Sequence, residues 1–148
     1  MKKAFTMIEL IFVIVIIGIL SAVAIPKLSS TAERAYITKA GTVLASVRSS
    51  LSTQRQKRIL RGLSDPITDL GEGSNAFSYF NGDTTDKKVL QYPVKNCIGE
   101  SKACWSRSIS GNTPTFIYRF PESGDAKFKL EGNTLVCDND SADCAKLE

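Results

Sequence analysis

The chain opens with a long apolar stretch and then changes to mixed patterning. Residues 10–25 carry no charged side chain, and the 21 residues from Phe5 to Ile25 contain a single acid, Glu9. As an α-helix, 21 residues are about 31 Å long, close to the thickness of a bilayer's hydrocarbon core. The pattern predicts a helix that crosses a membrane once.

Beyond Pro26 the apolar residues recur at spacings of three and four, which is the period of a helix with one buried face. Pro26 removes a backbone donor and is expected to kink or loosen the helix there. Basic residues crowd the last turns before Gly62, which suits the negative end of the helix dipole and a glycine C-cap. We therefore expect an amphipathic helix over residues 27–62 that ends near Arg61, with its buried face formed by Ala32, Tyr36, Ala40, Val43, Val47 and Leu51.

The remainder, residues 63–148, reads as a head rich in β-strands. Residues 63–96 are broken by prolines, glycines and the Asn81-Gly82-Asp83 turn signal, and are expected to form loops. Short β-prone runs follow at 115–120, 126–130 and 134–137, separated by turn sequences. They predict a three-stranded antiparallel meander, and hence an α+β fold in which a long amino-terminal helix packs on a small antiparallel sheet.

Charge is unevenly distributed along the chain. Residues 27–62 hold eight basic side chains against one acid, and residues 63–148 hold nine against thirteen, giving +7 and −4 within a total of +4. The basic cluster at the helix end has no interleaved aromatic residues, so a structural cap is favoured over contact with nucleic acid, which stays the alternative. The chain contains no histidine and no serine-hydrolase motif, which argues against an enzyme.

Two pairs of cysteines lie in the head, each pair with six residues between its members: Cys97, Cys104, Cys137 and Cys144. If the head lies outside the cytoplasm, disulfides are the default. Three connectivities are open, and the local spacing favours Cys97–Cys104 with Cys137–Cys144. A four-cysteine zinc site is the weaker alternative, because the spacing is looser than in structural zinc sites.

Between the last two cysteines lies a short run of hard oxygen ligands that includes Asp138, Asp140 and Asp143. Three carboxylates in one short loop repel one another unless a cation neutralises them, and calcium prefers such ligands. A weak calcium site is therefore one hypothesis for this loop. A polar turn held by a disulfide is the simpler interpretation, and no cofactor is otherwise expected.

The extreme amino terminus indicates topology and processing. Lys2 and Lys3 precede the apolar stretch, which places the leader in the cytoplasm and the head on the other side. Glu9 within the span needs a partner, and cleavage before Phe5 would create an α-amino group four residues away. The competing interpretation is a secretory signal cut after Ala24, at an A-x-A site, which would release a soluble domain.

The string MKKA followed by FTMIELIFVIVIIGILSAVAIP resembles the start of type IV pilins and of the pseudopilins of type II secretion and DNA-uptake machines. The resemblance covers about the first 26 residues, with Phe5, Glu9, Gly18 and Pro26 in family positions. It implies that a prepilin peptidase cuts between Ala4 and Phe5 and methylates the new amine, and that Glu9 guides subunits into a filament. The family usually has glycine where this chain has Ala4.

The resemblance thus implies a pilin-like fold and a single-pass protein of the bacterial inner membrane whose carboxyl-terminal domain is periplasmic until a filament assembles. We expect a leader at 1–4, an assembly helix at 5–26, an amphipathic helix at 27–62 and a head at 63–148.

The expected function is a pseudopilin of type II secretion or DNA uptake, with a major or minor pilin as the alternative. Expected partners are other copies, the peptidase, the assembly platform with its ATPase, and the lipid bilayer. In type II secretion, major pseudopilins bind calcium near the carboxyl end, which the Asp138–Asp143 loop resembles loosely.

Overall fold

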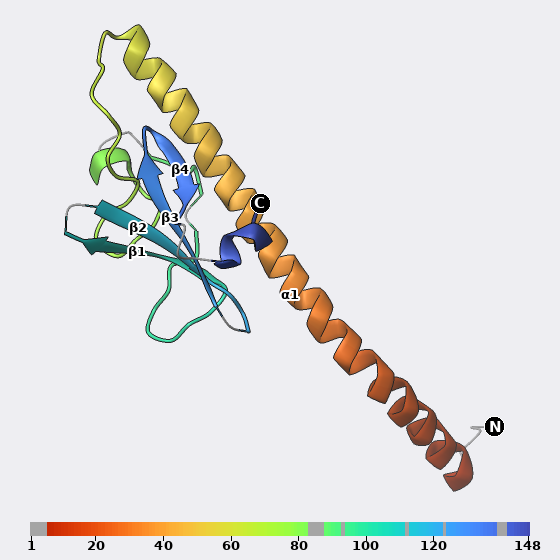
Figure 1. The fold of residues 1–148 in the computed structure, drawn as a ribbon. Coiled ribbons are helices and arrows are strands. Elements are labelled where there is room, and N and C mark those ends of the chain that lie inside the picture. The colour runs from red at the N-terminus through yellow and green to blue at the C-terminus, as the bar shows by residue number, and fades with distance from the viewer. Residues whose placement is uncertain (1–5, 83–87, 93, 112, 123, 139–141) are drawn as a thin grey trace. The chain divides into compact units, whose positions relative to one another are not determined.

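The computed structural model describes residues 6–148 apart from 83–87, 93, 112, 123 and 139–141 (Figure 1). One helix, α1 (Met7–Leu60), is followed by four strands and two short 3₁₀ turns, Phe80–Gly82 and Ala142–Lys146. The chain divides into two compact units, residues 1–35 and 36–148.

The first unit contains the apolar part of α1. The helix begins at Met7 and continues through Pro26 without interruption. Every large apolar residue from Met7 to Leu28 is exposed, with exposed fractions from 44% at Ile16 to 80% at Met7. Among the described helices, α1 is long and apolar enough to cross a membrane, and none of its most apolar 18-residue window is buried within the protein. The segment from Met7 to Leu28 therefore has exposed apolar side chains on all sides.

The carboxyl end of α1 is closed by a glycine cap. Gly62 has a φ of 73°, a left-handed conformation that glycine adopts without steric penalty. The Leu63 N–H donates to the Arg58 carbonyl at 3.0 Å and the Gly62 N–H to the Ile59 carbonyl at 2.9 Å, which is the Schellman pattern. The expected end near Arg61 with Gly62 as the cap agrees with the helix end at Leu60 to within one residue.

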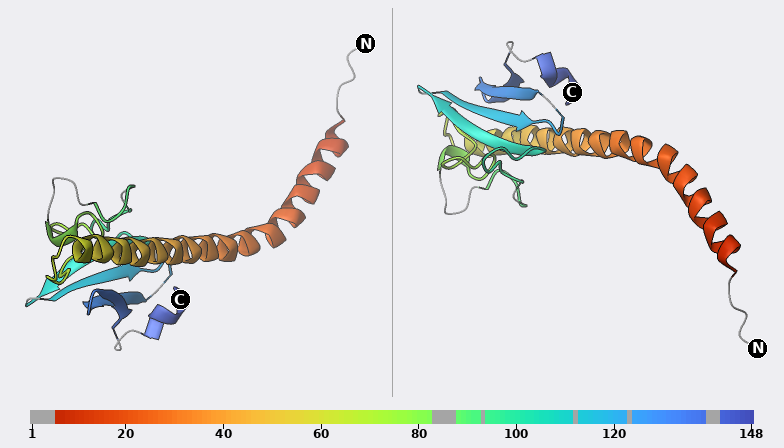
Figure 2. Two further views of the ribbon diagram at one scale, coloured as in Figure 1. Left: turned by 90° about the horizontal axis from the view of Figure 1, so that it is seen from above. Right: turned by 90° about the horizontal axis from the view of Figure 1, so that it is seen from below.

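The second half of α1 lies against one face of the sheet (Figure 2), and its buried stripe differs in part from the predicted one. Ala40, Val47 and Leu51 are buried as expected, and Val43 is partly buried. Ala32 and Tyr36 are exposed instead, and Leu44, which was not predicted, is buried to 1% exposure. The contact face therefore starts at Ile37, later along the helix than the spacing alone indicated.

The sheet has four antiparallel strands in chain order: β1 (Cys104–Ser110), β2 (Thr113–Arg119), β3 (Asp125–Glu131) and β4 (Thr134–Cys137). The α+β class and the meander of the last three strands are confirmed. The prediction of three strands was wrong by one, because β1 has three serines among its seven residues and a single β-branched residue, Ile109, so its composition does not mark it as a strand. A two-residue turn at Gly132 and Asn133, both with positive φ, joins β3 to β4.

Aromatic residues fill the space between the helix and the sheet. Phe116 of β2 lies opposite Phe128 of β3, and both are fully buried. Phe77, from the loop region, stacks on Phe116 with ring centroids 5.1 Å apart and meets Trp105 edge-on at 4.9 Å. The rest of the buried core comprises Ala40, Leu44, Val47, Leu51, Tyr118, Phe120 and Leu135, with smaller contributions from the loops.

Tyr118 of β2 links the sheet to α1 by a hydrogen bond. Its hydroxyl donates to the backbone carbonyl of Tyr36 at 3.2 Å. Burial, with a smaller contribution from the nearby Tyr36 side chain, raises the pKa of Tyr118 above its ordinary value. The phenol is therefore neutral at physiological pH and remains a hydrogen-bond donor.

The loop region between α1 and β1 has no regular strand among its described residues, as predicted. Hydrogen bonds and an ion pair from polar side chains hold part of it in place. The Asn81 side-chain oxygen accepts from the Thr68 N–H at 2.9 Å and the Asp69 N–H at 3.1 Å. Arg107 of β1 holds both carboxylate oxygens of Asp69, with its Nε 2.8 Å from Oδ1, and donates to the Gly73 carbonyl at 2.6 Å. A bidentate arginine fork of this kind fixes orientation as well as distance. These bonds fix the described part of the loop around Asp69.

The helix–sheet contact predicts a large stability difference between two leucines of α1. Leu44→Ala should lower the free energy of unfolding by about 2–5 kcal/mol, because it opens a cavity where helix and sheet meet. Leu60→Ala is the matched control, since Leu60 is 87% exposed, and should change stability by less than about 0.5 kcal/mol. Urea unfolding of the full chain in detergent, followed by the near-UV signal of Trp105, measures both. Equal losses would contradict the assigned contact face.

Candidate functional site

The first turn of α1 carries the one acid of the apolar segment. The Glu9 Oε2 lies 3.4 Å from both the backbone nitrogen and the hydroxyl of Thr6, and the Glu9 N–H donates to the Thr6 hydroxyl at 3.4 Å. This reciprocal arrangement is a capping box, with Thr6 as N-cap and Glu9 at the third helical position. The signal for it is the T-x-x-E spacing ahead of an apolar run, which our sequence interpretation did not use. Glu9 is therefore also a helix-start residue.

The capping box leaves the charge of Glu9 without a cationic partner. Within the part of the chain that the structure describes, no ammonium or guanidinium group lies at ion-pairing distance from this exposed carboxylate. The hydrogen bonds at 3.4 Å are also long for a charged acceptor. In an apolar surrounding, such a carboxylate gains from an ammonium group supplied by another molecule. Ala4 and Phe5, the expected cleavage and methylation residues, lie outside the described residues, so their role stays a prediction.

Apart from Thr6, the described residues next to Glu9 on α1 are apolar. Met7, Ile8, Leu10 and Phe12 are 80%, 76%, 56% and 68% exposed. In water, an exposed patch of this size indicates an interaction site or a membrane-embedded segment. Apolar contacts do not fix how two helices are oriented, but the Glu9 carboxylate can be satisfied only where a polar or cationic group reaches it. The site can therefore insert in a bilayer, and can also pack against identical segments.

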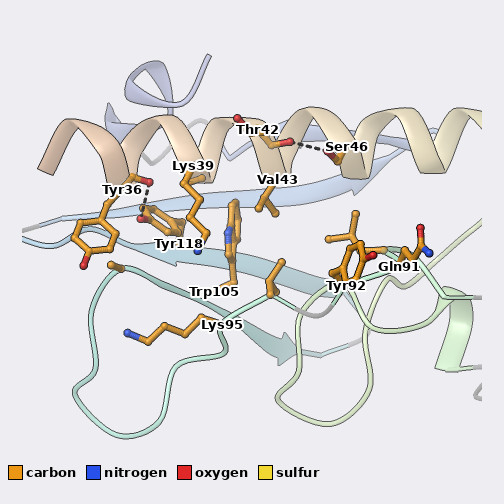
Figure 3. Close-up of a pocket in the computed structure, with 14 residues that line it drawn as sticks. Tyr36, Lys39, Thr42, Val43, Ser46, Gln91, Tyr92, Lys95, Trp105 and Tyr118 are labelled. Carbon is orange, nitrogen blue, oxygen red and sulfur yellow. Dashed lines mark hydrogen bonds between the residues drawn. The ribbon is translucent and has the colours of Figure 1, made fainter. Parts of the chain in front are cut away.

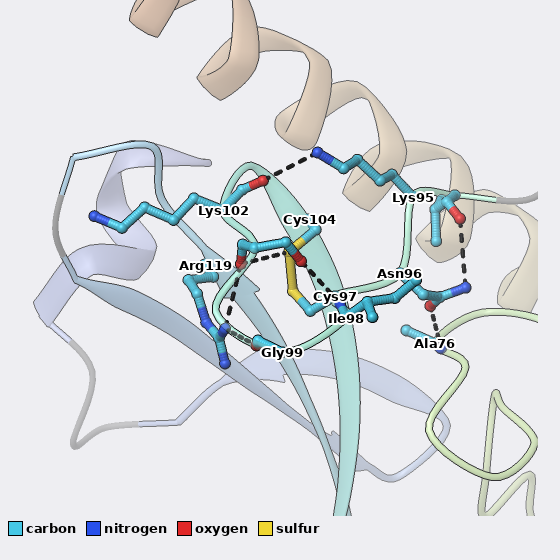
Figure 4. The surroundings of a disulfide bond; sticks show 11 residues. Ala76, Lys95, Asn96, Cys97, Ile98, Gly99, Lys102, Cys104 and Arg119 are labelled. Atoms are coloured by element: carbon cyan, nitrogen blue, oxygen red, sulfur yellow. Dashed lines mark hydrogen bonds between the residues drawn. A yellow bond between two sulfur atoms is a disulfide. The ribbon is translucent and has the colours of Figure 1, made fainter.

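The head contains two disulfides, Cys97–Cys104 and Cys137–Cys144, which is the pairing that the spacing favours. The first closes a loop beside the sheet (Figure 4). Arg119 of β2 donates to two carbonyls of that loop, Gly99 at 2.9 Å and Ser101 at 3.2 Å. The Cys97 N–H also donates to the Trp105 carbonyl at 2.8 Å. The loop is therefore held by a covalent bond and by backbone contacts.

The acidic loop between the second pair of cysteines is only partly described. Asp138 pairs with Lys129 at 2.8 Å and Asp143 with Lys146 at 2.8 Å, while Asp140 lies outside the described residues. Among the residues described, no group of three or more potential ligands is placed to hold a metal ion. A calcium site formed by these three aspartates stays a prediction, and two of its members already have lysine partners.

One basic residue at the end of α1, Arg58, makes structural contacts. The Arg58 guanidinium donates to the Asp65 carbonyl at 2.9 Å and to the Pro66 carbonyl at 3.2 Å, so it secures the chain that leaves the helix. Arg48, which lies earlier on α1, pairs with Glu148 at 2.6 Å and donates to the Leu135 carbonyl at 3.1 Å. The Arg58 contacts favour the structural interpretation of the cluster over contact with nucleic acid.

Comparison with known proteins shows similarity to pilins both in the amino-terminal segment and over most of the chain. Residues 1–25 match the family model of the prokaryotic N-terminal methylation motif. The chain is 31% identical over 126 residues to a type IV major pilin protein PilE1 of Neisseria gonorrhoeae, an alignment that covers 78% of this chain and 75% of that protein.

Two further relatives match over shorter alignments. A fimbrial protein of Moraxella nonliquefaciens is 46% identical over 55 residues, which cover 37% of this chain and 36% of that protein. A fimbrial protein of Pseudomonas aeruginosa is 43% identical over 61 residues, 41% of this chain and 37% of that protein. The chain thus matches little more than a third of the length of these two relatives. No solved structure matches significantly.

Three variants separate the two roles of the first turn. Glu9→Gln keeps the capping box but removes the charge, Glu9→Ala removes both, and Thr6→Ala removes the cap hydroxyl but keeps the charge. We expect all three proteins to insert in the membrane, and only Thr6→Ala to enter filaments. The measurement is quantitative immunoblotting of membrane and sheared-filament fractions. Filament incorporation of Glu9→Gln at the wild-type level would show that helix capping, and not charge, is what assembly requires.

Proposed function

Because the chain belongs to the type IV pilin family, we propose that it is a pilin of a surface type IV pilus. Members of this family are structural filament subunits and not enzymes, and their precursors are anchored in the membrane and processed by prepilin peptidase. Our expectation of a secretion or DNA-uptake pseudopilin has less support than its alternative, because the relatives are named as fimbrial proteins and major pilins.

The observation that carries the proposal is the length of one alignment. The amino-terminal segment resembles pilins and pseudopilins alike, so the methylation motif at residues 1–25 does not distinguish the two. The alignment with the gonococcal major pilin extends over 126 residues and therefore includes most of the head. Head similarity to a major pilin supports a role in a pilus, where heads form the outer surface.

The fold suggests how one chain serves both membrane and filament. Before assembly, the apolar unit of α1 lies in the inner membrane, with Lys2 and Lys3 in the cytoplasm and the head in the periplasm, where both disulfides are stable. In the filament, the same apolar surface packs against the corresponding surface of other copies. The Glu9 carboxylate of one copy then pairs with the α-amino group of Phe5 in its neighbour, so that both charges are neutralised in an apolar interior.

The partners follow from this cycle. Prepilin peptidase prepares the α-amino group, and an inner-membrane platform with its ATPase supplies the work of extracting the helix from the bilayer. The chain itself provides the leader at 1–4, the assembly helix at 5–26, the amphipathic helix at 27–62 and the head at 63–148. Contact with nucleic acid is not part of the proposal.

The proposal requires cleavage between Ala4 and Phe5. Mass spectrometry of the membrane-extracted protein should show a chain that lacks Met1 to Ala4 and carries one methyl group on Phe5. Ala4→Gly should be processed at least as completely, because it restores the residue usual in the family. A mature chain that begins at Ile25 would instead identify a secreted domain cut after Ala24 and would contradict the filament role.

The proposed surface location separates a pilin from a pseudopilin. At native expression, the protein should be recovered in the fraction sheared from intact cells, as filaments that an antibody against the head decorates along their length. A strain without the assembly ATPase is the control, and should keep the processed protein in its inner membrane. Normal processing with no surface filaments under piliating conditions would favour the pseudopilin alternative.

A further inference from the structure

A pocket of about 580 Å³ opens between the second half of α1 and the loop that leads into β1 (Figure 3). One wall is helical and contributes Tyr36, Lys39 and Val43, and the floor includes Trp105 of β1 and Tyr118 of β2. All of these residues lie within the second unit of the chain. The volume falls in the range of small-molecule sites. Neither the filament contacts nor the disulfides described above involve it.

The charge of the pocket is exclusively positive. Lys39 and Lys95 are its charged lining residues, and no acidic side chain is among them. The Lys95 ammonium donates to the Lys102 carbonyl at 3.3 Å. Lys39 extends from α1 into the pocket, and within the described residues it has neither a hydrogen-bond nor an ion-pair partner. An unpaired ammonium group beside apolar walls favours an anionic ligand.

The other lining groups suit a ligand with both an apolar face and several hydroxyl groups. Trp105 and Tyr118 are each 3% exposed and close the bottom of the pocket, while Tyr36 and Tyr92 are 47% and 78% exposed and offer its accessible aromatic faces. The helix contributes the hydroxyls of Thr42 and Ser46, which donate to the carbonyls of Thr38 and Thr42 and so present free acceptor lone pairs. Gln91 adds an amide that can both donate and accept.

We propose that this pocket binds a carboxylated sugar, such as a hexuronate unit of an acidic polysaccharide. The carboxylate pairs with Lys39, the apolar face of the sugar ring lies against the exposed aromatic side chains of Tyr36 and Tyr92, and the ring hydroxyls donate to Thr42 and Ser46. An acidic side chain from a second copy of the chain would satisfy Lys39 but would leave most of the pocket volume empty. The whole set of lining groups therefore fits a ring-sized acid better than a single side chain.

The chain offers an internal probe of this site, because Trp105 is its only tryptophan. We would titrate the full-length protein, held in a detergent without a sugar headgroup, with D-glucuronate and follow Trp105 emission. Saturation-transfer NMR on the ligand would run in parallel. A saturable change with a half-point on the order of 1 mM is expected, as for a single small-ligand site. Glucose and acetate should give no saturable change at the same concentrations, since glucose lacks the carboxylate and acetate lacks the sugar ring with its hydroxyl groups.

Lys39→Ala tests the ion pair, and Lys57→Ala is the matched control. Lys57 is an exposed lysine of the same helix that does not line the pocket. Loss of a charge-assisted hydrogen bond should weaken glucuronate binding about tenfold or more in Lys39→Ala and leave Lys57→Ala unchanged. Absence of both the fluorescence and the NMR signal would overturn the proposal. Equal binding of acetate or of glucose, or equal effects of the two lysine variants, would overturn it as well.

Discussion

The rest of the structure depends on one constraint: the apolar surface of α1 is divided between a part that its own chain covers and a part that it does not. From Ile37 onward, one stripe of the helix is buried against the aromatic face of the sheet. From Met7 to Leu28, large apolar side chains lie on all sides of the helix and are exposed. A single small sheet can cover one face of a helix but not all of them. The uncovered part therefore requires a bilayer or other copies.

The position of Glu9 makes this surface selective. Apolar packing alone is non-directional and permits many registers between identical helices. One carboxylate among apolar residues penalises every arrangement that leaves it unpaired, and so favours those that bring an ammonium group to it. The Thr6–Glu9 capping box adds a second consequence, since it stabilises the start of the helix next to the place where cleavage would create the new α-amino group.

The features that local patterns encode could be predicted from the sequence. The apolar segment, the glycine cap at Gly62 and the meander from β2 to β4 each follow from composition or spacing over a few residues. The features that were missed depend on distant partners. β1 pairs with β2 despite its serines, Asn81 and Arg107 hold a loop whose course no local pattern reveals, and the pocket under Lys39 forms only when helix, loop and sheet meet. The Thr6–Glu9 capping box was readable in the sequence and was overlooked.

The most direct test of this account is a helical reconstruction of filaments sheared from cells, at a resolution that shows side chains. The account predicts that the chain begins at Phe5, that the apolar part of α1 lies in the filament interior surrounded by the same part of other copies, and that the heads face outward. The Glu9 carboxylate should lie within ion-pairing distance of a neighbour's α-amino group. Filaments in which this helix is absent, or in which Glu9 faces solvent away from any amine, would contradict the central claim.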